Sequence, residues 1–84
     1  MVEEKIMFTS IDDVKSFAAL ANTKNYDVDI TSGKYLINAK SIMGIFSLDL
    51  TKPLTLVAYC DDDKAFLKEI ESYIYVDETS ANEE

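Results

Sequence analysis

The first part of the chain changes its hydrophobic period between neighbouring segments. Residues 6–8, Ile-Met-Phe, form a short apolar run between charged and polar residues, which is typical of a short strand that ends at a turn. Ser10 is a good N-cap, and Asp13, three residues later, completes a loose capping box. Over residues 11–22 the apolar positions recur at steps of three and four, which predicts a helix with one buried face formed by Ile11, Val14, Phe17, Ala18 and Ala21.

From Tyr26 onward the period is two. Tyr26, Val28 and Ile30 alternate with polar residues and predict a half-buried strand. Residues 32–33, Ser-Gly, mark a tight turn, and residues 34–39 return as a second strand. The simplest arrangement of this segment is an antiparallel hairpin.

Residues 40–48 are too rich in apolar side chains to alternate as a strand. Ser41 stands where an N-cap belongs, so the segment predicts a short helix, with Ile45 and Leu48 in the core. After Pro53 the apolar residues alternate again and predict another strand with Leu54, Leu56 and Ala58 on one face.

The last predicted element is a helix that begins at three consecutive aspartates, residues 61–63. Its buried stripe consists of Phe66, Ile70 and either Tyr73 or Ile74. Residues 77–84 are polar and acidic, without any period. We therefore expect one domain over residues 1–76 and an acidic, disordered tail over residues 77–84.

The order of the predicted elements is β-α-β-β-α-β-α. Strands and helices in this order build an α+β protein in which the helices cover one face of a sheet. We expect an open-faced sandwich of two layers, with a four-stranded, mainly antiparallel sheet and all helices on one face.

Composition then excludes several classes of function. The 84 residues include no His and no Arg, and sixteen acidic residues against eight Lys give a net charge of −8. Without His there is no Ser-His or Cys-His nucleophile pair and no imidazole metal ligand. A negative field repels nucleic acid and anionic membranes. The single cysteine, Cys60, agrees with a reducing compartment. We expect a cytoplasmic protein that uses no metal or cofactor and binds neither nucleic acid nor membrane.

Residues 40–50, Lys-Ser-Ile-Met-Gly-Ile-Phe-Ser-Leu-Asp-Leu, resemble the regulatory serine segment of HPr, the small phosphocarrier of the bacterial sugar phosphotransferase system. The chain length, the order of elements and the strand start at residues 26–29, Tyr-Asp-Val-Asp, are also similar to that family. The resemblance covers about residues 4–76 and implies the HPr fold.

The resemblance breaks down at the residues that carry the family's chemistry. HPr proteins have a histidine at the start of the first helix, in the pattern Gly-Ile-His-Ala-Arg-Pro-Ala, and residues 10–16 occupy this place. Asp12 replaces the histidine, and only Ile11 fits the pattern. In this respect the chain resembles the catabolite-repression variant of HPr, in which the histidine is also replaced. We therefore expect neither histidine phosphocarrier activity nor enzymatic activity.

Asp12 has two interpretations. An acid in the first helical turn is favoured by the helix dipole, which accounts for both Asp12 and Asp13. An aspartyl-phosphate acceptor would need Mg²⁺ held by neighbouring carboxylates and a fixed lysine, and only Asp13 and Lys15 are close in sequence.

The resemblance implies that Ser41 is phosphorylated by a dedicated kinase and that the phosphoprotein acts as a corepressor partner. The same serine is also an ordinary N-cap, and the motif does not separate the two roles. Ile42, Met43 and Phe46 are either core residues or, as the resemblance implies, part of the surface offered to protein partners.

Our leading hypothesis is a non-catalytic, HPr-like regulatory or adaptor protein that is switched by phosphorylation of Ser41. As a monomer it would bind protein partners: an HPr-type kinase, a transcription regulator or components of the phosphotransferase system. The alternative is a plain protein–protein interaction module on the same fold, with no phosphorylation role.

Overall fold

The computed structural model describes residues 1–76, and the tail expected over residues 77–84 lies outside the described residues. The elements follow the predicted order, with a short 3₁₀ turn, η1, added after the last helix. Their bounds are β1 (Val2–Ile6), α1 (Ile11–Asn22), β2 (Val28–Ser32), β3 (Tyr35–Asn38), α2 (Ile42–Phe46), β4 (Leu54–Ala58), α3 (Asp63–Ile70) and η1 (Glu71–Tyr73).

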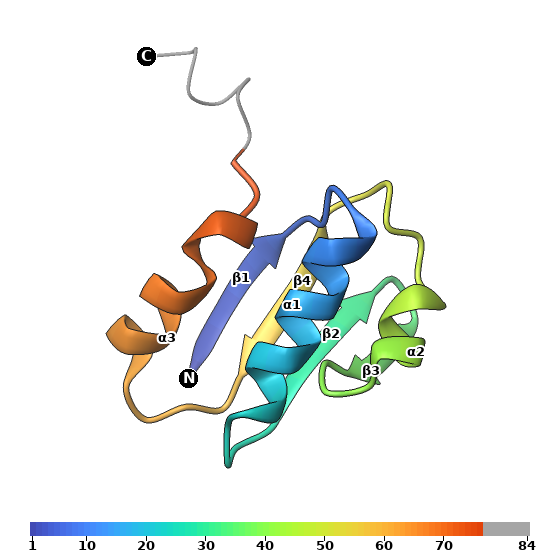
Figure 1. Ribbon diagram of the computed structural model, residues 1–84. Coiled ribbons are helices and arrows are strands. Elements are labelled where there is room, and N and C mark those ends of the chain that lie inside the picture. Colours follow the sequence, from blue (N-terminus) through green and yellow to red (C-terminus); the bar gives the residue numbers. More distant parts are fainter. Residues whose placement is uncertain (77–84) are drawn as a thin grey trace.

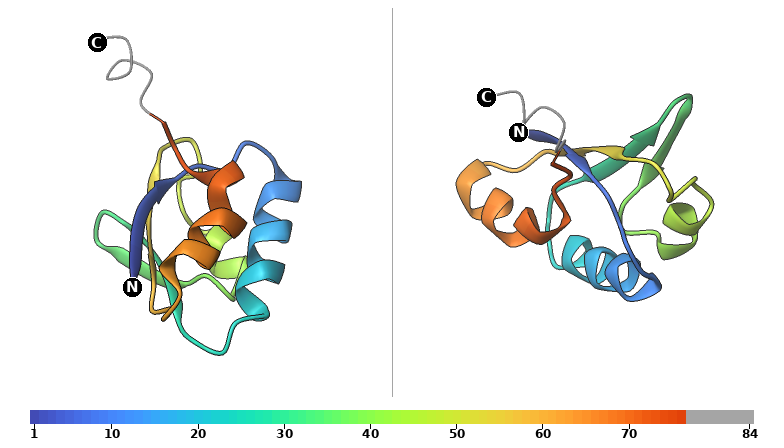
Figure 2. Two further views of the ribbon diagram at one scale, coloured as in Figure 1. Left: turned by 90° about the vertical axis from the view of Figure 1, so that its left-hand side faces the viewer. Right: turned by 90° about the horizontal axis from the view of Figure 1, so that it is seen from above.

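The strands form one sheet in the order β1-β4-β2-β3, and every neighbouring pair is antiparallel (Figure 1). The central strand β4 pairs Leu56 with Glu4 of β1 on one side and with Ile30 of β2 on the other. The three helices lie together on one face of the sheet (Figure 2). The predicted open-faced, two-layer α+β sandwich is therefore confirmed.

The alternating pattern of β4 separates the two faces of the sheet. Leu54, Leu56 and Ala58 are buried beneath the helices, whereas Thr55 and Val57 are half-buried on the open face. The helices contribute large apolar side chains to the same core, and together with the strands they bury Ile6, Val14, Phe17, Val28, Ile30, Ile45, Leu54, Leu56, Phe66 and Ile70 almost completely.

The prediction for the first strand was wrong in its position. The strand covers Val2–Ile6, not residues 6–8, because Val2 and Ile6 point into the core while Glu3 and Lys5 are exposed. Charged residues are common on edge strands, where they discourage pairing with other chains. The free side of β1 is partly covered by residues 74–75, since the Tyr75 N–H donates to the Lys5 carbonyl at 2.8 Å.

The predicted hairpin is confirmed with two shifts at its ends. Its first strand begins at Val28 instead of Tyr26, whose ring packs edge-on against Phe66 at 6.1 Å. Its two-residue turn consists of Gly33 and Lys34, so Lys34 is not part of the second strand. Gly33 has φ of 60°, a left-handed conformation that glycine adopts at the first central position of a hairpin turn.

Helix α1 has the predicted bounds, but one of its predicted core residues is exposed. Val14, Phe17, Ala18 and Ala21 are buried, whereas Ile11 is 64% exposed. Ile11 is the first residue of the helix, and the helical period alone does not show whether the neighbouring layer covers it.

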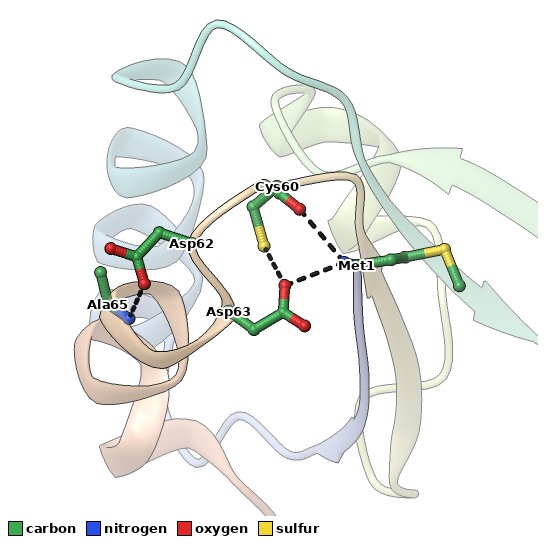
Figure 3. Close-up of polar contacts among 5 residues, drawn as sticks. All are labelled: Met1, Cys60, Asp62, Asp63 and Ala65. Carbon is green, nitrogen blue, oxygen red and sulfur yellow. Dashed lines mark hydrogen bonds and ion pairs between the residues drawn. The ribbon is translucent and has the colours of Figure 1, made fainter.

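Hydrogen bonds fix the start of α3, as Figure 3 shows. Asp62 is the N-cap, and its Oδ1 accepts the Ala65 N–H at 3.1 Å. The Asp63 carboxylate accepts hydrogen bonds from the Met1 ammonium at 2.8 Å and from the Cys60 thiol at 3.4 Å. Burial and the bond to Asp63 raise the pKa of the Cys60 thiol. Cys60 is therefore a buried, protonated small residue.

The structure predicts that Leu56→Ala destabilises the fold much more than Val57→Ala on the same strand. Leu56 is fully buried, so its truncation should lower the free energy of unfolding by about 3 kcal/mol, against about 1 kcal/mol or less for Val57 on the open face. Urea denaturation of the two variants measures the difference. Equal losses would contradict the assignment of the two faces.

Candidate functional site

The start of α1 holds two acidic residues in different environments. Ser10 is the N-cap, and its Oγ accepts the Asp13 N–H at 3.1 Å. The Asp13 carboxylate turns back to accept the Thr9 N–H at 3.0 Å and the Thr9 hydroxyl at 2.8 Å. These bonds, the backbone bond first, lower the pKa of Asp13. The predicted capping box therefore forms, with Thr9 in place of Ser10 as the residue bound by the carboxylate.

Asp12 lies at the N-terminal end of α1. It is the second residue of the helix and its side chain is exposed. Within residues 1–76, the Asp12 carboxylate forms no hydrogen bond or ion pair, whereas the Asp13 carboxylate accepts two hydrogen bonds from Thr9. Its carboxylate is therefore presented to solvent beside a second carboxylate.

Ser41 is the N-cap of α2, as predicted. Its Oγ accepts the Gly44 N–H at 3.1 Å, and the residue is exposed. A Cβ at position 44 would lie 3.2 Å from the Ser41 Oγ, a tight contact that glycine avoids. The structure therefore explains both the serine and the glycine of the segment on capping grounds.

The apolar residues of α2 divide between the core and the surface. Ile45 is fully buried and Leu48 is buried at the end of the segment, as predicted. Met43 is 75% exposed and Phe46 is 37% exposed, whereas Ile42 is half-buried against the core. Of the three candidate partner-binding residues, Met43 and Phe46 thus lie on the surface, and Ile42 is shared between the surface and the core.

Phe46 meets the start of α1 at a shallow hollow of about 240 Å³, which we call the α1–α2 hollow. It is lined by Phe8, Ser10 and Ile11 on one side and by Phe46, Leu50 and Thr51 on the other. The sequence did not identify Ile11 or Leu50 as surface residues of a site. Nothing in their spacing distinguishes them from core residues, because the hollow that they line forms only where the end of α2 meets the start of α1.

Asp12 and Ser41 lie near opposite ends of α1. The Asn22 amide at the C-terminal end of α1 donates to the Lys40 carbonyl at 3.0 Å, which places the start of α2 there. The end of α2, at Phe46, lies against the start of α1. The two helices therefore run in opposite directions (Figure 1), and the structure does not bring the two sequence-predicted groups together.

Two further features of residues 1–76 bear on the sequence predictions. This part of the chain brings together no group of three or more carboxylate or thiol ligands that could hold a metal ion. It also contains no helix of the length and apolar character that crossing a membrane requires.

Comparison with known proteins identifies the family. Residues 14–75 match the PTS-HPr family, described as "PTS HPr component phosphorylation site", and the chain belongs to this family. HPr proteins are phosphocarriers of the phosphotransferase system and are not themselves enzymes. The match begins two residues after Asp12, and Ser41 lies within it. A comparison of the sequence with curated proteins gives no match.

Solved structures of the family have the same fold. HPr-C-His from Thermoanaerobacter tengcongensis is 26% identical, with a TM-score of 0.68 over 87% of this chain and 88% of that one. The Bacillus subtilis catabolite repression protein Crh is 29% identical, with a TM-score of 0.61 over 87% of this chain and 85% of that one. HPr from Bacillus anthracis, 24% identical with a TM-score of 0.66 over 88% and 96%, shares the fold. The Crh structure is described as an intertwined, swapped dimer.

We predict that Asp13 makes stability depend on acid pH. The pKa of Asp13 is lowered in the folded state, so its contribution is complete above the ordinary value of 3.8 and is lost as the pH falls from there through the lowered pKa. The native chain should therefore lose more stability over this range than Asp13→Asn, measured by urea denaturation at a series of pH values. Parallel pH profiles of the two proteins would contradict the prediction.

Proposed function

We propose that this chain is a regulatory or adaptor member of the HPr family that relays no phosphoryl group through a histidine and acts by being bound. The observation that carries the proposal is the pairing of an altered helix start, residues 10–16, with a retained serine segment, residues 40–48. The chain contains no histidine at any position, so imidazole phosphorylation is chemically excluded for it.

The electrostatics of the α1 start support the loss of transfer. A phosphohistidine carrier places a neutral nucleophile at a helix N-terminus, where the dipole and a nearby arginine stabilise the phosphoryl dianion. Here Asp12 and Asp13 put two carboxylates at that end, and Asp13, whose pKa is lowered by its hydrogen bonds from Thr9, stays ionised even in mild acid. The chain also has no arginine to offset them. An approaching phosphoryl group would therefore be repelled.

Ser41 is the proposed switch. Phosphorylation at an N-cap adds nearly two negative charges where backbone N–H groups point outward, so the modified residue remains compatible with the helix. Ser41 is exposed, and its hydroxyl oxygen accepts a hydrogen bond from the Gly44 N–H. Since the change is confined to the surface, its effect falls on docking of a partner and not on the fold.

The proposed partner surface consists of Met43, Phe46 and the α1–α2 hollow. An exposed methionine makes adaptable apolar contacts, and an exposed aromatic ring gives a larger rigid one. Phosphorylated Ser41 would lie on the same short helix as both residues. The proposed occupants are other proteins: an HPr-type kinase, a transcription regulator or phosphotransferase components.

A plain interaction module remains the second proposal, favoured by the same exposed side chains and by the capping role that already explains Ser41. In that case partners bind the α1–α2 surface without any modification. We also propose residues 1–76 as the functional domain and a monomer as its working state, although the Crh relative is described as a dimer.

The experiment is incubation with an HPr kinase and ATP, followed by intact-mass measurement. We expect the native chain to gain one phosphoryl group and Ser41→Asn to gain none, because asparagine keeps the N-cap but has no hydroxyl. Ser47→Ala is the matched control within the same segment and should be modified like the native chain.

An unmodified native chain, in a reaction that modifies a reference HPr, would contradict the serine switch and favour the plain interaction module. Modification that persists in Ser41→Asn would place the phosphate elsewhere and would equally contradict it.

A further inference from the structure

A second hollow, whose lining residues differ from those of the α1–α2 hollow, lies where the β2–β3 hairpin separates from the loop before β4. It has a volume of about 870 Å³, and we call it the hairpin hollow. The pairing of β2 with β4 ends at Thr31 and Thr55, whereas β2 remains paired with β3 as far as Ser32 and Tyr35. Continuing the register would bring Gly33 opposite Pro53, which has no N–H for the ladder. The hairpin tip therefore projects alone (Figure 2, right).

Three of the eight lysines of this acidic chain line the hairpin hollow. They are Lys5 from β1, Lys34 from the hairpin turn and Lys52 from the loop before β4. The only acidic residue among the lining side chains is Asp49. Three positive charges against one negative charge leave two positive charges at this place, in a chain whose net charge is −8. Such a local reversal of charge favours binding of an anion.

These lysines are weakly neutralised by their neighbours. Lys5 donates to the Thr55 hydroxyl at 2.9 Å, which is an uncharged partner. Lys52 is 3.9 Å from Asp49 with its side chain 76% exposed, an arrangement of little energetic value. Asp49 is itself bound by the Thr51 N–H at 3.0 Å and the Thr51 hydroxyl at 2.6 Å. Among residues 1–76, Lys34 forms no ion pair.

The remaining lining side chains indicate what else the anion carries. Thr31, Ser32, Ser47 and Thr55 also line the hollow and carry hydroxyl groups. The Ser47 and Thr31 hydroxyls donate to the Gly44 and Thr55 carbonyls at 2.6 and 3.5 Å, and their oxygens keep lone pairs that can accept from a ligand. Tyr35, which is 70% exposed, adds an aromatic wall. The volume is in the range of pockets that hold small molecules. Two positive charges, several hydroxyls and one ring together match a doubly charged phosphate on a small polyhydroxylated body.

We infer that the hairpin hollow is a binding site for a sugar phosphate, with Lys5, Lys34 and Lys52 holding the phosphate and the hydroxyl groups contacting the sugar. This site is separate from the α1–α2 surface and does not depend on phosphorylation of Ser41. The site lies next to Ser47 and Leu48, directly after the end of α2. Through it the protein would sense a charged metabolite.

The test is an NMR titration of the ¹⁵N-labelled full chain with glucose 6-phosphate as the probe. We expect saturable shifts of the Thr31, Gly33 and Thr55 amides, which line the hollow. The double variant Lys34→Gln/Lys52→Gln should bind roughly tenfold more weakly, because two charged donors are lost. Lys64→Gln/Lys68→Gln on α3 changes the total charge equally and should bind like the native chain.

Three results would overturn the inference. The first is the absence of shifts at the hollow, and the second is equal weakening in both double variants, which would show only a general charge effect. The third is tight binding of only one part of the ligand, measured by titrating inorganic phosphate and glucose separately. Phosphate binding as tightly as glucose 6-phosphate would reject the sugar contacts, and glucose binding as tightly would reject the phosphate contacts. The ¹⁵N spectra of both variants show whether they remain folded.

Discussion

The whole fold depends on the burial of one face of the four-stranded sheet beneath the helices. β4 lies between β1 and β2, so its inward side chains contact the helices from the centre of the sheet. Leu54 and Leu56 are almost inaccessible to solvent, and Phe17 of α1 and Phe66 of α3 are equally buried above the sheet. Because α1 and α3 are fixed by this burial, their N-terminal ends are fixed as well. The N-terminal end of α1 carries Asp12 and Asp13, on which the proposed function depends.

The packing of the helices on the sheet also keeps Asp12 and Ser41 apart. α1 spans about 18 Å at 1.5 Å per residue, and α2 runs beside it in the opposite direction. Asp12 therefore lies beside the surface that holds Phe46, and Ser41 lies near the other end of α1. A phosphate on Ser41 would act on a partner that spans the α2 surface. It would not act directly on the chemistry of the α1 start.

Local patterns predicted most of the fold. The helix over residues 11–22 and the strand at Leu54–Ala58 have their predicted bounds, because one period and a clear cap or proline mark each of them. The first strand was misplaced, since its charged residues alternate with only two buried ones on an edge. Ile11 was misassigned because a helical period does not show where the neighbouring layer ends. The hollows escaped prediction for a related reason: each is formed by segments distant in sequence.

The central proposal is that Asp12 stands where HPr proteins carry their phosphorylated histidine, so that this chain relays no phosphoryl group and functions through binding. The most direct measurement is incubation with labelled phosphoenolpyruvate and the general phosphotransferase enzyme, with a histidine-containing HPr as the positive control. The account predicts label on the control and none on this chain. Label that is released by hydroxylamine, as an acyl phosphate is, and that disappears in Asp12→Asn would contradict it.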